Sequence, residues 1–191
     1  LNSGQVAGFR ASMYIANRYK EADLSKEAGE KAVAGRIGEL MSWMANAKTA
    51  GDSWRDARLE LQQRMTKAAA HIRSLDSLKE ASRAAREQWL RINENGCSYE
   101  SVAEAFEAFN TRQLCFAHLV YLEAVSAAVA AGVGSRGSAL VLDSSGTAAH
   151  KDLGREWCFV PEDPSFREKV LETTASSDGA VRSEWIARRP V

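Results

Sequence analysis

Apolar side chains recur three and four residues apart along most of the chain, a pattern typical of helices with one buried face. The most regular stretch holds Trp54, Ala57, Leu61, Met65, Ala68 and Ile72. A second holds Leu78, Ala81, Ala85, Trp89 and Ile92. A third holds Val102, Phe106, Phe109, Leu114, Leu119, Leu122 and Val125. Because short loops make long neighbouring helices antiparallel, residues 51–133 are predicted to form an antiparallel, spectrin-repeat-like three-helix bundle.

Polar residues and glycines mark the expected ends of these helices. Ser53, Asp76 and Ser98 precede the three stretches, and such residues can accept a hydrogen bond from a free N–H of the first turn. Gly96 and Gly132 follow the second and third stretches. Glycine ends helices readily because it adopts the left-handed conformation without strain.

Residues 1–50 are predicted to add an N-terminal helix pair. Apolar positions recur from Ser3 to Lys20 and again from Lys26 to Lys48, without a proline in either stretch. Ser3 is the expected N-cap of the first helix. Thr49 to Ser53, with Gly51 inside, is the expected break before the bundle.

The tail, residues 134–191, has a different character. Turn-forming residues occupy Val133 to Gly137, and Asp143 to Gly146 is also expected to turn. Short extended segments are predicted at Ala139–Leu142, Trp157–Val160 and Val181–Ala187, with a brief helix near Phe166–Thr173. The fold class is therefore mainly α, with an irregular tail that carries short strands.

Composition excludes several kinds of protein. The 191 residues carry 25 basic and 25 acidic side chains, so a nucleic-acid-binding domain with its usual basic excess is not indicated. No run of about 18 uncharged apolar residues occurs, so no membrane span is expected. The first residue is Leu1 and a helical pattern begins at once, which leads us to expect a piece of a longer protein.

Cysteine and histidine usage points to no metal site. Cys97, Cys115 and Cys158 are odd in number and widely spaced, which favours buried thiols and a cytoplasmic location over a disulfide scaffold. His118 lies in an apolar stretch, where a satisfied core histidine is favoured over a ligand or base. The nucleotide-binding, zinc-protease and serine-hydrolase motifs are missing from the sequence, so no catalytic residue is assigned.

The start of the chain has the character of a ligand-binding helix terminus. The residues concerned are Asn2, Ser3, Gly4 and Gln5. A helix start offers free N–H donors and a partial positive charge, which suit an anion or the electron-rich edge of a ligand. An ordinary helix cap is the alternative.

A second unusual segment follows the third helix. It consists of Ser135, Arg136 and Gly137. The guanidinium of Arg136 can form paired hydrogen bonds with a carboxylate of a neighbouring domain. Alternatively, it is a cation that interacts with the C-terminal end of a helix dipole.

Both segments resemble parts of one family. Asn2-Ser3-Gly4, opening the helix GQVAGFRASMYIA, resembles the Asn-Ser-Leu helix that closes the FAD-binding domain in the flavoprotein subunits of succinate dehydrogenase and fumarate reductase, and in L-aspartate oxidase. Gly134-Ser135-Arg136-Gly137 is similar to the family's Glu-Ser-Arg-Gly motif, and Arg58–Met65 and Leu78–Trp89 match its helices in order. The ending Ser183–Pro190 is similar to the tails of FAD-dependent oxidoreductases from anaerobes.

The resemblance implies a role in a larger enzyme. The chain would be the C-terminal helical region of an FAD-dependent oxidoreductase, packed on the preceding FAD-binding domain of the same protein. Backbone N–H groups of Ser3, Gly4 and Gln5 would face the pyrimidine edge of the flavin, and Ser135 to Gly137 would contact the neighbouring domain. The chain alone would be inactive, and an electron-transfer subunit is a further expected partner. A freestanding helical-bundle interaction module remains the alternative, and a helical scaffold within a multi-subunit complex is compatible with the first hypothesis.

Overall fold

The computed structural model describes residues 2–19, 25–48, 50–137 and 139–189. Helices dominate it, and most of the short strands follow the long helices, which confirms the mainly α prediction. The chain divides into two compact units, residues 1–41 and 42–191. Each unit is considered by itself.

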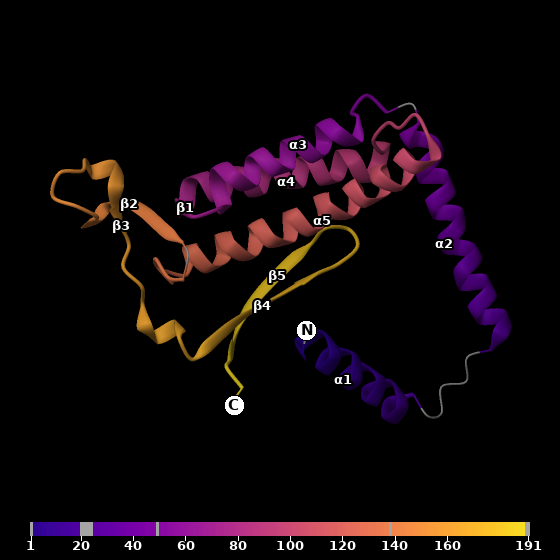
Figure 1. Cartoon of the computed structure of the whole chain (residues 1–191), viewed down its shortest axis with the longest axis horizontal. Coiled ribbons are helices and arrows are strands. Elements are labelled where there is room, and N and C mark those ends of the chain that lie inside the picture. Colours follow the sequence, from indigo (N-terminus) through magenta and orange to yellow (C-terminus); the bar gives the residue numbers. More distant parts are fainter. Residues whose placement is uncertain (1, 20–24, 49, 138, 190–191) are drawn as a thin grey trace. The chain divides into compact units, whose positions relative to one another are not determined.

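The first unit consists of helix α1 (Asn2–Arg18) and most of helix α2 (Lys26–Ala47), the expected N-terminal pair (Figure 1). Helix α1 begins at Asn2, so Ser3 lies inside the first turn and the prediction of Ser3 as the N-cap was wrong. The expected end at Lys20 lies outside the described residues. Side chains are exposed throughout Gly4–Tyr19 and from Lys26 to Glu39, so the unit has no core among its described residues.

The second unit is built on three long helices. Helix α3 (Trp54–Arg64) continues into a π-helical turn (Met65–Ala69), and α4 (Leu75–Asn95) and α5 (Val102–Ala130) follow. They lie side by side and successive helices run in opposite directions (Figure 1). The predicted antiparallel three-helix bundle is therefore present.

Serine caps all three bundle helices. The hydroxyl of Ser53 accepts a hydrogen bond from the backbone N–H of Asp56, as expected. Helix α4 is capped by Ser74 rather than Asp76, because Ser74 and Ser77 exchange the reciprocal bonds of a capping box. The cap of α5 is Ser101 rather than Ser98.

The predicted buried face is correct for α4 and partly wrong for its neighbours. Every apolar position predicted on α4 is buried: Leu78, Ala81, Ala85, Trp89 and Ile92. Ile72 is 46% exposed, since the helix has already ended before it. On α5, Val102, Phe106 and Leu114 are 78%, 69% and 43% exposed, respectively. The buried residues of α5 are Ala105, Ala108, Thr111, Cys115, His118, Leu119 and Leu122.

A buried amide joins α3 to α4. The side chain of Gln88 is almost fully buried. Its Nε2 donates to the backbone oxygen of Ala57 at 2.8 Å and to Glu60 at 3.1 Å, while its Oε1 accepts from Arg64 at 2.8 Å. Both ends of the amide are therefore satisfied, as a buried polar group requires.

The last turn of α2 belongs to the second unit. The indole N–H of Trp43 donates to the backbone oxygen of Ile92 at 3.1 Å, and its ring meets Phe109 edge-on at 6.2 Å between centroids. Ala47, also in this turn, is fully buried against the backbone of Gly96. These contacts fix the end of α2 on α4 and α5.

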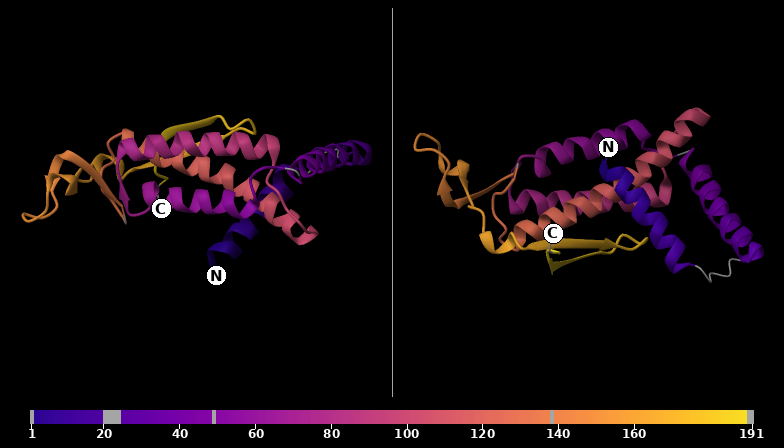
Figure 2. Two further views of the ribbon diagram at one scale, coloured as in Figure 1. Left: turned by 90° about the horizontal axis from the view of Figure 1, so that it is seen from above. Right: turned by 60° about the horizontal axis from the view of Figure 1, so that its bottom comes forward.

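The tail forms two small sheets, one of them together with a short strand that lies between α3 and α4. Strands β1 (Ile72–Arg73), β2 (Leu140–Ala148) and β3 (Cys158–Phe159) pair in that order, with β1 parallel to β2 and β2 antiparallel to β3. Short 3-10 turns occupy Arg155–Trp157 and Pro164–Phe166. Strands β4 (Lys169–Ala175) and β5 (Val181–Ala187) form a hairpin that contacts α5 (Figure 2).

The predictions for the tail were mostly correct. Extended structure occurs at all three expected places. The prediction of a brief helix near Phe166–Thr173 was wrong, because most of that segment lies in strand β4. The turn expected at Asp143 lies inside β2. Leu142 and Thr147 both pair with Phe159, so the residues between them bulge out. The Asp143 carboxylate accepts from the N–H and hydroxyl of Ser145, at 2.8 and 2.6 Å, and stabilises the bulge.

Candidate functional site

The candidate ligand-binding residues Asn2, Ser3, Gly4 and Gln5 all lie in the first turn of α1. Within the described helix no residue lies four positions before the first three of these residues, so this part of the helix offers their N–H groups no acceptor. Gln5 lies one position further along, and its exposed side-chain amide is a further donor.

The first turn of α1 fits an electron-rich group. It holds no acidic residue, so no carboxylate competes for the free N–H donors or cancels the positive end of the helix dipole. The side of Gly4 where a Cβ would stand is open, with no atom within 4 Å. These residues can therefore donate to one electron-rich edge of a ligand, and further protein groups would have to bind the rest of it.

The second predicted segment is fixed to the tail by backbone contacts. The N–H of Ser135 donates to Val160 O at 2.9 Å, and the Ser135 hydroxyl accepts from Val141 N at 2.9 Å. Gly134 has φ +73°, and a Cβ there would lie 1.9 Å from Pro161 O. Only glycine allows so close an approach of the two backbones. Gly137 also has a positive φ, of 61°.

Arg136 is accompanied by a carboxylate of its own chain. Its Nε lies 3.8 Å from Oε1 of Glu162, and the Arg136 side chain is 44% exposed. Glu162 accepts two shorter hydrogen bonds from Arg167, at 3.1 and 2.7 Å. These hydrogen bonds lower the pKa of the Glu162 carboxyl. Arg136 therefore keeps donors for another group, and its contact with a neighbouring domain stays a prediction.

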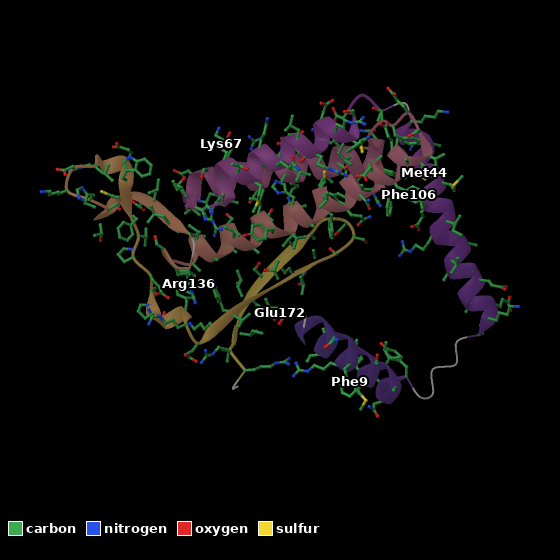
Figure 3. The ribbon with its side chains drawn as sticks, viewed as in Figure 1. Phe9, Met44, Lys67, Phe106, Arg136 and Glu172 are labelled. Atoms are coloured by element: carbon green, nitrogen blue, oxygen red, sulfur yellow. The ribbon has the colours of Figure 1, made fainter. Side chains whose placement is uncertain are left out.

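A groove of about 350 Å³ lies beside Arg136, at the end of the bundle. Figure 3 labels Arg136 there, at the opposite end of α5 from Phe106. Its lining comes from the end of α5, the turn after it, β1, β2 and the β4–β5 hairpin. These segments are far apart in the sequence, so no local motif could have revealed the groove.

His118 is a core residue, as the sequence favoured, but one of its ring nitrogens lacks a hydrogen-bond partner among the described residues. It is 7% exposed, and its Nε2 has no hydrogen-bond partner among the described residues. Burial, with a smaller contribution from the charge of Arg64, lowers the pKa of His118 to about 4. The imidazole is therefore neutral near pH 7.

The three cysteines are buried and free. Burial raises the pKa of Cys97 to about 11 and that of Cys115 to about 12. A thiol is a weak nucleophile until it ionises, so neither residue is suited to covalent catalysis. In the described part of the chain, no three His, Cys, Asp or Glu side chains come together as a metal site would require.

One described helix, α5, is long and apolar enough to cross a membrane, judged by length and composition. The same helix packs on α3 and α4, and its buried face includes Thr111 and His118. Glu123, also on α5, pairs with Arg86 of α4 at 2.8 Å. The absence of a membrane span stays a prediction.

Comparison with known proteins places the fold. No protein-family model matches the chain, and no curated protein matches it. Among solved structures, a mutant of E. coli quinol fumarate reductase FrdA is similar, with a TM-score of 0.69 and 20% sequence identity. The match covers 98% of this chain and 29% of that chain. The likeness is one of fold. This chain therefore spans less than a third of the protein that it resembles.

Proposed function

We propose that this chain is the C-terminal helical region of an FAD-dependent oxidoreductase, packed on an FAD-binding domain that lies outside it. The observation that carries the proposal is the fold likeness to the fumarate reductase chain, which extends over nearly all of this chain and only a part of that one. The sequence resemblance at Asn2–Gly4 and Gly134–Gly137 supports the same family from independent residues.

Exposed apolar side chains support a missing partner domain. On α1, Phe9 and Met13 are 68% and 48% exposed, and on α2 Ile37 and Met41 are 56% and 62% exposed. Large exposed apolar patches are uncommon on isolated soluble domains and mark contact surfaces. Helices that bury no apolar face of their own gain stability only when another surface covers them.

In the proposed enzyme the first turn of α1 would bind one edge of the flavin. The flavin supplies hydride transfer to or from a carbon–carbon or carbon–nitrogen bond beside a carboxylate. The N–H groups of Ser3 and Gly4 and the amide of Gln5 would orient that edge, and the positive end of the helix would favour negative charge there. Ser135 to Gly137 would contact the FAD-binding domain, and a cytoplasmic location and an electron-transfer partner belong to the same proposal.

Two measurements test this assignment. The reading frame upstream of Leu1 should encode a strand–turn–helix with the dinucleotide fingerprint GxGxxG. The chain alone should not quench flavin fluorescence at micromolar FAD and should not reduce an enoate acid. An upstream frame without such a domain, or flavin binding and reduction by the chain alone, would contradict the proposal.

A variant pair tests the flavin contact in the longer protein. Gly4→Pro removes one N–H donor at a position where the first turn of a helix tolerates proline, and Gly4→Ala keeps that donor. We expect a more negative flavin midpoint potential in Gly4→Pro than in Gly4→Ala, because reduced flavin loses a stabilising hydrogen bond. Equal potentials would remove Gly4 from the proposed contact.

The alternative is a freestanding helical interaction module. The exposed residues of α1 and α2 favour it equally, since they also suit a separate partner protein. It predicts a natural start codon close to Leu1 and no flavin domain in the same reading frame. The upstream sequence therefore separates the two.

A further inference from the structure

The groove at the end of the bundle combines an apolar wall with three cations. Arg73, Arg136 and Lys169 line it together with apolar residues of α5 and the hairpin. Its volume is about 350 Å³. No Asp or Glu is among the described residues that line it.

Each of the three cations retains capacity for a ligand. Arg73 uses its Nε on the backbone oxygens of Ala69 and Ala70, which holds the side chain in place and leaves the terminal nitrogens of the guanidinium to other acceptors. Arg136 lies 3.8 Å from Glu162, which is too far for a short hydrogen bond. The ammonium of Lys169 lies 5.2 Å from the ring centre of Phe166.

Two nearby carboxylates, Glu162 and Asp163, offset part of the positive charge of the groove, because they interact electrostatically with Arg136 and Lys169. Glu162 accepts two hydrogen bonds from Arg167. Asp163 accepts from the N–H of Ser165 at 2.8 Å. Because Glu162 also pairs with Arg167, the three cations of the lining outweigh these carboxylates, and an acidic occupant would complement the remaining positive charge.

The apolar part of the groove has the composition of a protein-binding surface. Trp185 and Leu171 of the hairpin are half-buried, and Val133 forms a buried part of the wall. Tryptophan and arginine are enriched among residues that dominate binding energy at protein interfaces. The wall would take a bulky apolar side chain, and the cations would take carboxylates beside it.

We propose that this groove binds a peptide segment of a partner protein in which a bulky apolar residue is flanked by aspartate or glutamate. The inference goes beyond the proposed flavoprotein function, and none of the lining residues belongs to α1. The groove shares Arg136 with the proposed contact to the FAD-binding domain, so that domain and the peptide would compete for this side chain. If the groove bound no acidic peptide, the flavin assignment would still stand. If the flavin assignment failed, peptide binding to the groove could still be tested by itself.

Selection from a displayed library of random heptapeptides on the immobilised 191-residue chain tests the proposal. We expect enrichment of peptides with Asp or Glu next to Leu, Phe or Trp. A synthetic enriched peptide, followed by fluorescence anisotropy, should bind more weakly as salt is raised, because charge pairs at the rim are screened.

Charge-removing variants locate the binding site. Arg136→Gln with Lys169→Gln should weaken that peptide about tenfold or more, in line with the loss of two charge-assisted hydrogen bonds. Lys151→Gln with Arg155→Gln is the matched control, since it removes the same charge from two exposed residues outside the groove. The control should change affinity less than twofold, and both variants should melt like the unmodified chain.

Several results would overturn the proposal. These are an absence of enriched peptides, enrichment of basic or neutral peptides, and equal weakening by both double variants. Binding of dodecanoate or anionic vesicles at the groove without any acidic peptide would likewise replace a protein partner with a small amphiphile or a membrane surface.

Discussion

Gly96 is the residue whose substitution should damage the fold most selectively. It has φ +79° and ψ −167°, a region of backbone space that is essentially restricted to glycine. A Cβ at this position would lie 2.4 Å from Cβ and 2.5 Å from Cα of Ala47, in the last turn of α2. Both residues are buried, so the clash has no solvent side toward which it can relax.

The cost of Gly96→Ala follows from two terms. Backbone strain in such a region is worth about 1–3 kcal/mol. Overpacking against a rigid backbone neighbour is worth about 1–3 kcal/mol more. We therefore expect a loss of about 3 kcal/mol or more in the free energy of unfolding, which for a unit of this size lowers the melting temperature by roughly 6–12 °C.

Urea denaturation followed by circular dichroism measures this loss. Gly132→Ala is the control, because Gly132 also has a positive φ, of 86°, but no neighbouring atom lies within 4 Å of the position that its Cβ would take. That variant should lose only the strain, about 1–2 kcal/mol. A cost for Gly96→Ala no greater than that for Gly132→Ala would refute the close contact between Gly96 and Ala47.

Three further predictions concern buried polar groups. Gln88→Leu should lower the free energy of unfolding by about 1–3 kcal/mol in urea denaturation, because Nη1 of Arg64 loses its buried acceptor and the Ala57 carbonyl loses its side-chain donor. Arg64 keeps its contact with Glu60. A loss under about 0.5 kcal/mol would contradict this. The pKa of His118 is lowered to about 4 in the folded chain. Between roughly pH 4 and 6.5 the unfolded chain therefore binds more protons at this residue than the folded chain does. The free energy of unfolding should fall by up to about 1.4 kcal/mol per pH unit as the pH is lowered through this range. Urea midpoints across this range should lose that slope in His118→Phe, and an unchanged slope would contradict the assignment. Cys97 and Cys115 should react with a disulfide reagent at about pH 8 only after the chain unfolds. Both thiols are buried, and their pKa values are raised to about 11 and 12, so little thiolate forms at that pH. Rapid labelling of the folded chain would contradict this prediction.

Periodicity in the sequence was sufficient to predict the helices and the face of α4. It failed on α5 because the rule counts bulky apolar residues, whereas the buried face there uses Ala105 and Ala108. Small residues allow neighbouring helices to approach closely, and the bulky Val102 and Phe106 then lie on the outside. A hydrophobic pattern cannot distinguish a side chain that packs inside the bundle from one that faces outward.

For the candidate sites, residues that are close together in the sequence could be predicted as a group, and residues that meet only through the fold could not. The first turn of α1 could be predicted because its residues are consecutive. Arg136 could be singled out from its neighbours, but its carboxylate Glu162 comes from a different part of the tail. The groove depends on Arg73 and Lys169, which are almost a hundred positions apart and meet only through the packing of the tail on the bundle.

The apolar surface around Phe106 and the groove beside Arg136 lie at opposite ends of α5 (Figure 3). They differ in physical character, and this difference bears on what each would bind. Around Phe106 the helix exposes bulky side chains because small residues such as Ala105 and Ala108 make its internal contacts. An apolar surface of that kind is best covered by a large, permanent partner. At the other end, Arg136 and Lys169 add positive charge to a small groove, and charge favours fast and selective association over permanent burial. The apolar end therefore suits a permanent partner. The charged end, where Arg136 also belongs to the proposed contact with the FAD-binding domain, suits an acidic peptide that binds and leaves.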